Sequence, residues 1–105
     1  MGKFEFRGEL QFLIEKAIAG NIDDIDYIMS NLSSESLFSM TRYVDFALSL
    51  VENVNGKERI KYYLFNGTQI QRNYASLYFN RRGDWEIVKE AFKKGLIDEI
   101  QAYGR

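Results

Sequence analysis

The chain of 105 residues contains no cysteine and no histidine. Without cysteine it forms neither a disulfide nor a thiolate metal site, and nothing in its composition favours an oxidising compartment. Without histidine it also lacks the usual general base near neutral pH and the usual activator of a nucleophile. We therefore expect a cytoplasmic protein that is not an enzyme.

Proline is absent as well, and eight glycines remain to punctuate the chain. Proline is the residue that helix interiors exclude most strongly, so its absence favours helix. Five glycines follow amphipathic stretches, at the position where helices commonly end: Gly20, Gly56, Gly67, Gly83 and Gly95. The sequence predicts an all-α fold of five or six short helices stacked as antiparallel hairpins, either helical-repeat-like or an irregular bundle.

Long apolar runs are missing too: none approaches the roughly 18 residues that a membrane helix needs, and the N-terminus does not read as a signal peptide. Phe4 and Phe6 alternate with charged residues, as in a short strand, but such a strand has no obvious partner. We expect residues 1–8 to form a flexible or loosely docked arm, and residues 9–105 to form a single helical domain.

The first half of the chain predicts a hairpin followed by a long helix. Apolar residues recur at helical spacing on both sides of Gly20, and Asn21 is placed to cap the second helix. Ser33 or Ser34 opens a helix over Glu35–Asn53 that is apolar around more than half its circumference. A helix of this kind normally lies at the centre of a core, so we expect its neighbours to surround it.

The stretch from Thr68 to Leu96 predicts a second hairpin with marked boundaries. Thr68 can cap a helix whose third residue is Gln71, and Gly83 can take the left-handed conformation that ends it. Asp84 is expected to cap the next helix. The apolar residues that these two helices should bury are Ile70, Tyr74, Leu77 and Tyr78 in the first, and Val88, Ala91 and Phe92 in the second.

Part of this hairpin resembles one unit of the HEAT-like helical repeats. The matching pattern consists of Ile70, Arg72, Ala75, Phe79, Gly83 with Asp84, Val88 and Phe92. An ankyrin-type unit is also partly similar, although its Thr-Pro-Leu-His turn is absent. Both resemblances imply a scaffold that binds other macromolecules on a stacked helical surface, because repeat arrays generally bind and seldom catalyse.

Cofactor and metal motifs are not evident. The glycines show neither of the spacings that cradle phosphate groups. Asp23, Asp24 and Asp26 offer few oxygen donors for a cation, and they suit the first turn of a helix, where negative charge is favourable. We therefore expect no cofactor and no metal.

Charge is divided unevenly along the chain. Residues 1–54 carry four basic and nine acidic side chains, for a net −5, whereas residues 55–105 carry ten and six, for a net +4. A basic half can meet nucleic acid or an acidic partner. Alternatively, the two halves complement each other within the fold or between copies, so a homo-oligomer is among the expected assemblies.

Aromatic and basic residues gather within 24 positions of the second half. The set is Tyr62, Tyr63, Phe65, Arg72, Asn73, Tyr74, Tyr78, Phe79, Arg81, Arg82 and Trp85. Rings beside guanidinium groups are typical of protein interface hot spots and of single-stranded nucleic-acid sites. They are equally consistent with core aromatics and arginines that complete a helix end.

From this cluster we predict a partner-binding set of Tyr62, Arg72, Arg81, Arg82 and Trp85. We expect a small protein–protein interaction module that does not contact a membrane. In one version of this expectation, the module associates with itself. The alternative is a nucleic-acid-binding accessory protein that uses the basic half. Glu86 and Glu90 lie among the lysines of that half and dilute the field that a phosphate backbone would meet.

Overall fold

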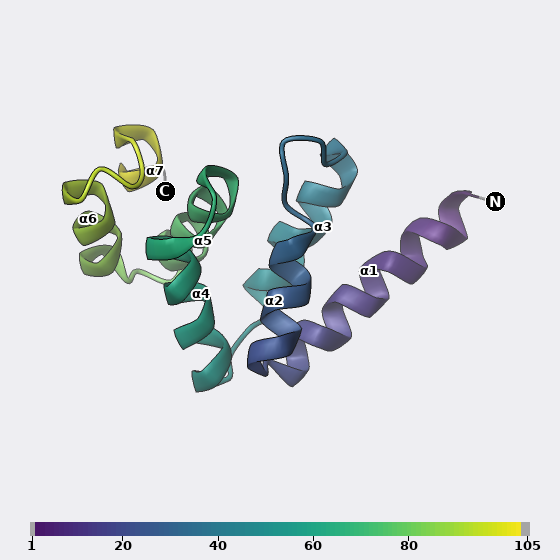
Figure 1. The fold of residues 1–105 in the computed structure, drawn as a ribbon. Coiled ribbons are helices and arrows are strands. Elements are labelled where there is room, and N and C mark those ends of the chain that lie inside the picture. Colours follow the sequence, from purple (N-terminus) through teal and green to yellow (C-terminus); the bar gives the residue numbers. More distant parts are fainter. Residues whose placement is uncertain (1, 104–105) are drawn as a thin grey trace. The chain divides into compact units, whose positions relative to one another are not determined.

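The computed structural model describes the backbone of residues 2–103 and the side chains of residues 8–103 (Figure 1). Over this part the chain forms helices and no strand, which confirms the all-α prediction, with one or two helices more than expected. The helices are α1 (Gly2–Ala19), α2 (Ile22–Ser30), α3 (Phe38–Ser49), α4 (Val54–Asn66), α5 (Gln69–Arg81), α6 (Trp85–Lys93) and α7 (Glu99–Tyr103).

The chain divides into two compact units, one up to Arg59 and one from Ile60 onward, and α4 runs through the division. In the first unit, α1, α2 and α3 pack on one another around Leu13, Ala17, Ile25, Ile28, Met29, Leu32, Val44, Ala47, Leu48 and Val51. In the second, α5, α6 and α7 pack together, and the buried apolar residues are Ile60, Leu64, Ala75, Tyr78, Phe79, Val88, Ala91, Ile97 and Ala102.

The turn between α1 and α2 requires a glycine for two reasons. Gly20 has a φ of +65°, and a Cβ built on it would lie 2.7 Å from Cβ of Asn53. This confirms Gly20 as a helix end. Gly56, by contrast, lies inside α4 and ends no helix, so that prediction is wrong; a Cβ there would lie 3.1 Å from the carbonyl oxygen of Gly20, and the close approach explains the residue.

The alternation of Phe4 and Phe6 does not produce a strand, because α1 already begins at Gly2. Helical hydrogen bonds within one segment need no second strand, whereas a lone terminal strand would leave its backbone groups unpaired. The side chains of residues 1–7 lie outside the described residues. Loose docking of the arm over residues 1–8 therefore stays a prediction.

The helix predicted over Glu35–Asn53 is shorter, and it is not central. It starts only at Phe38, because serine side chains hold the preceding segment in a turn: the Ser33 amide donates to Oγ of Ser36 at 2.9 Å, and the Glu35 amide donates to Oγ of Ser33 at 3.3 Å. Such local bonds compete with helix. The prediction that a serine opens the helix is therefore wrong.

One face of α3 is buried and the opposite face is open. Val44, Ala47 and Leu48 are buried, whereas Phe38 and Phe46 are 70% and 50% exposed. The excess of apolar residues thus reflects exposed aromatics, not a helix surrounded by neighbours.

The hairpin of α5 and α6 is the best-predicted element. The Thr68 side chain accepts from the Gln71 amide at 3.3 Å, the Gln71 side chain accepts from the Thr68 amide at 2.9 Å, and Gly83 has a φ of +78°. Asp84 occupies the predicted N-cap position of α6, but its side chain makes no capping hydrogen bond and its ψ of 59° departs from the usual cap geometry.

The buried face of α5 is shifted from the predicted one. Ile70, Tyr74 and Leu77 are only half-buried, and the buried positions are Ala75, Ser76, Tyr78, Phe79 and Asn80. Small and polar residues are buried here because α5 contacts both α6 and α7, so its contact face is broader than one apolar stripe.

Candidate functional site

The five predicted partner-binding residues all lie from α4 to the start of α6, but they do not form one cluster. Arg72 is in the first turn of α5 and Arg81 is its last residue. Nine residues of helix separate them by about 13 Å along the axis. The structure therefore brings together Arg81, Arg82 and Trp85 at the turn between α5 and α6, and separates Arg72 from them.

Arg72 makes its hydrogen bonds within the second unit. Its Nε donates to the carbonyl oxygen of Leu96 at 2.7 Å, and its two terminal nitrogens donate to the carbonyl oxygen of Gly67 at 2.8 Å and to Oε1 of Gln69 at 2.9 Å. The guanidinium thus joins the end of α4 to the segment after α6. This geometry assigns Arg72 to the framework of the second unit.

Arg81, Arg82 and Trp85 form what we call the Trp85 tip. Trp85 is 45% exposed, and its indole Nε1 donates to the carbonyl oxygen of Asn80 at 3.2 Å. The guanidinium carbon of Arg82 lies 4.4 Å from the ring centre of Tyr78. Both side chains are anchored on α5 while part of their surface stays accessible, so the tip presents a preorganised ring and guanidinium group, with the exposed carboxylates Asp84 and Glu86 on either side of Trp85 in the sequence.

A buried amide lies under the tip. Asn80 is 4% exposed, and its Nδ2 donates to the carbonyl oxygen of Gln101 at 2.7 Å, which ties α5 to α7. Within residues 8–103, its Oδ1 has no hydrogen-bond partner. The bond that Asn80 does make holds the end of α5 in place, and with it the base of the tip.

Tyr62 lies on α4, 45% exposed, with its ring centre 5.5 Å from that of Tyr63 in an edge-to-face arrangement. It also belongs to the last part of α4, one turn before Asn66, which donates to its carbonyl oxygen at 3.1 Å. Whether any of the five predicted residues binds a partner stays a prediction.

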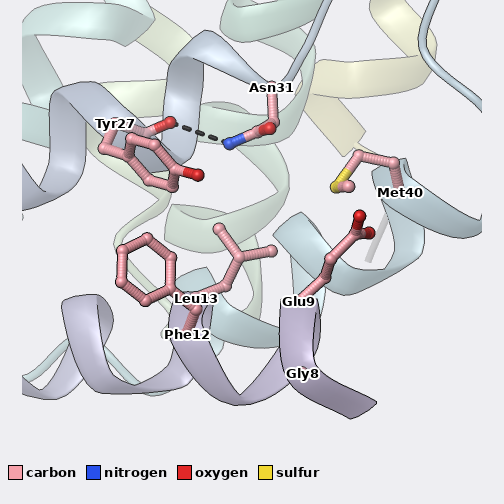
Figure 2. Close-up of a pocket in the computed structure, with 7 residues that line it drawn as sticks. All are labelled: Gly8, Glu9, Phe12, Leu13, Tyr27, Asn31 and Met40. Atoms are coloured by element: carbon pink, nitrogen blue, oxygen red, sulfur yellow. Dashed lines mark hydrogen bonds between the residues drawn. The ribbon is translucent and has the colours of Figure 1, made fainter. Parts of the chain in front are cut away.

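A second candidate site is a hollow of about 370 Å³ in the first unit. Its lining consists of Gly8, Glu9, Phe12, Leu13, Tyr27, Asn31 and Met40. Figure 2 shows the rings of Phe12 and Tyr27 on one side, with Glu9 and Met40 on the other. The lining is mainly apolar, and a single carboxylate stands at its edge.

The two rings of the hollow are fixed in place. Phe12 and Tyr27 meet edge-to-face with their centres 5.3 Å apart, and Nζ of Lys16 lies 5.0 Å and 5.2 Å from those centres. Nζ of Lys16 also lies 3.5 Å from the Asp24 carboxylate. At the far side of Tyr27, Nδ2 of Asn31 donates to its carbonyl oxygen at 2.9 Å (Figure 2).

The sequence did not reveal this hollow. Phe12 and Tyr27 fall outside the apolar stripes of their helices, and both are more than 40% exposed. The only sequence signal for the hollow was one aromatic residue outside the apolar stripe on each of two consecutive helices. The spacing alone does not show that the two rings meet.

Two of the three acidic residues of α2, Asp24 and Asp26, have structural partners. Oδ2 of Asp24 accepts from the Asn21 amide at 3.2 Å, and the carboxylate of Asp26 accepts two bonds from Arg59 at 2.7 Å and 3.2 Å. In the part of the chain whose side chains are described, no three acidic residues gather at metal-binding distance. No described helix has both the length and the apolar character to cross a membrane.

Comparison with family models, curated proteins and solved structures yields no match to the chain. The likeness to HEAT-like repeats therefore rests on the residues of the α5–α6 hairpin alone.

Proposed function

We propose that the chain is a small, non-enzymatic protein–protein interaction module whose contact surface is the Trp85 tip. The observation that carries this proposal is the exposure of Trp85: the only tryptophan of the chain is 45% exposed, three residues after Arg82 and four after Arg81. Tryptophan, tyrosine and arginine are the residues most enriched in interface hot spots.

The anchoring of the tip supports the same proposal. Trp85 is held by Asn80, and Arg82 lies against the ring of Tyr78, so a partner meets side chains that are already partly ordered. Ordering a long side chain on binding costs about 0.5–1.5 kcal/mol. A surface that is ordered before binding avoids part of that cost.

Self-association and a cytoplasmic location belong to this proposal. Self-association is supported by the opposite charges of residues 1–54 and 55–105. The location is supported by a sequence without cysteine, as is usual for proteins that work in a reducing compartment.

The proposal is tested by capture of partners from native cell lysate, with and without nuclease. The wild type and Trp85→Ala are compared with Phe46→Ala, a control that removes a ring of similar exposure from the first unit. We expect a protein that is retained by the wild type and by the control, survives nuclease, and is lost with Trp85→Ala.

Two results would contradict this proposal. A partner that is retained equally by Trp85→Ala would remove the tip from the function. Tight oligonucleotide binding that weakens steeply with salt would instead favour the nucleic-acid-binding alternative, because contacts to phosphates release counterions and their affinity therefore falls as salt rises.

A further inference from the structure

We propose that the hollow of the first unit binds a small amine, in which a protonated amino group is joined to an aromatic or aliphatic body. The hollow lies in the first unit and the Trp85 tip in the second, so the two proposals stand separately. The hollow thereby gains a ligand class of its own, beyond the function proposed for the tip.

The polar side chains that line the hollow offer hydrogen-bond acceptors to a ligand. Glu9 is exposed, and among the side chains described its carboxylate takes part in no ion pair. Asn31 already uses its Nδ2 on the carbonyl oxygen of Tyr27 at 2.9 Å, so the atom that it can offer is Oδ1. A carboxylate and an amide oxygen suit a ligand that brings donors, and an ammonium group has three N–H donors and no acceptor.

The cation next to the hollow does not satisfy Glu9. Nζ of Lys16 lies 5.0 Å and 5.2 Å from the ring centres of Phe12 and Tyr27, but Lys16 is not among the residues of the lining. Its charge is paired with the Asp24 carboxylate at 3.5 Å. Residues 1–54 carry a net −5, so the field around the hollow attracts a cation from solution.

The rest of the lining suits an apolar body of limited size. Phe12, Leu13, Tyr27 and Met40 provide apolar surface, and the two rings are held edge-to-face at 5.3 Å. The volume is about 370 Å³. At about 30 Å³ for each atom, the share of one water molecule in the liquid, this holds on the order of a dozen non-hydrogen atoms. A free small molecule with one ring and a short amino chain fits this space.

The positions of the two kinds of surface allow one molecule to meet both. Figure 2 shows Glu9 across the hollow from the rings of Phe12 and Tyr27. An amine whose ammonium group reaches the carboxylate therefore places its apolar body toward the rings. The carboxylate selects the charge of the ligand, and the apolar wall contributes most of the contact area.

The test is a titration of the full chain with compounds that share a phenyl ring and differ in charge: phenethylamine, the neutral phenethyl alcohol and the anionic phenylacetate. NMR spectra of protein labelled at the methionine methyl groups report the binding. Met40 lines the hollow, whereas Met29 is fully buried in the core of the same unit and serves as an internal control.

We expect the Met40 methyl signal to shift saturably with phenethylamine, at a Kd of about 1 mM, as is usual for a ligand of this size. The alcohol should bind about fivefold more weakly, because an exposed ion pair contributes up to about that factor. Phenylacetate should bind more weakly still, because its charge repels Glu9. The Met29 signal should move much less than that of Met40.

Two variants with the same change of charge locate the site. Glu9→Gln removes the carboxylate of the hollow, and we expect it to weaken phenethylamine binding about fivefold and to leave binding of the alcohol unchanged. Glu15→Gln is the matched control, because Glu15 is also exposed on α1, accepts from Nε2 of Gln11 at 3.2 Å and does not line the hollow. It should bind phenethylamine like the wild type. Far-UV circular dichroism checks that both variants stay helical.

Several results would overturn the inference. A Met40 signal that stays unmoved up to about 10 mM phenethylamine would show that the hollow binds no amine of this kind. Equal affinities for the amine and the acid, or equal losses with Glu9→Gln and Glu15→Gln, would show that Glu9 does not select the ligand. None of these outcomes bears on the Trp85 tip, whose test is the capture of a protein partner.

Discussion

At the scale of single residues, Arg72 connects three parts of the second unit through one side chain. It binds two carbonyl oxygens and one side-chain oxygen at 2.7 to 2.9 Å, and it is half-buried. Hydrogen bonds to charged groups contribute about 1.5–3 kcal/mol, and removal of the donor leaves the acceptors without their partner.

We therefore expect Arg72→Ala to lower the free energy of unfolding by about 2–3 kcal/mol in urea titrations. Arg81→Ala is the control, because an exposed arginine should contribute no more than about 1 kcal/mol. Equal effects of the two substitutions would refute the framework role of Arg72.

Among the helices, α3 has apolar residues of two kinds, and only the buried ones are expected to stabilise the fold strongly. Leu48 is 1% exposed and packs in the first unit, whereas Phe46 on the same helix is 50% exposed. Truncation of a buried leucine removes its contacts and leaves a cavity, at a cost of about 2–5 kcal/mol. Truncation of the exposed ring of Phe46 removes far fewer packing contacts.

Leu48→Ala should therefore reduce the unfolding free energy by about 3 kcal/mol, and Phe46→Ala by less than about 1 kcal/mol. Chemical denaturation followed by circular dichroism measures both. A large loss with Phe46→Ala would instead support the central position that the sequence pattern of this helix indicates.

The elements also show how far sequence reasoning reaches. The α5–α6 hairpin was predictable because its limits are local: Thr68 and Gln71 bond within one turn, and Gly83 takes a conformation that other residues resist. Caps and turns of this kind are visible in a few adjacent residues.

What could not be predicted depends on residues that are distant in the sequence. Gly56 is explained by the backbone at Gly20, and Arg72 by a carbonyl 24 residues away at Leu96. The length of α5 predicts that Arg72 lies away from the Trp85 tip. It does not predict that the guanidinium of Arg72 makes hydrogen bonds within its own unit. The hollow likewise requires α1 and α2 to be placed against each other.

At the scale of the whole molecule, α4 belongs to both units, and this bears on the predicted single domain over residues 9–105. Gly56 is buried in the first unit, and Ile60 and Leu64 are buried in the second. Units of about 50 residues are marginal by themselves, and a helix that runs through both links the unfolding of one to the other.

We expect the chain to unfold as one cooperative unit. Trp85 reports on the second unit by fluorescence, and circular dichroism reports on all helices. Leu48→Ala, a change in the first unit, should shift both denaturation midpoints equally. A shift in circular dichroism with an unchanged Trp85 midpoint would show two domains.

The hydrogen-bond acceptors of Arg72 determine which positions of this sequence can change during evolution. Leu96 offers its main-chain carbonyl, and every amino acid has that group. Position 96 can therefore exchange its side chain without loss of the acceptor, whereas position 72 cannot give up its guanidinium without loss of the bond. In descendants of this sequence, the junction would persist as a solitary invariant arginine, with no second position that changes in step with it.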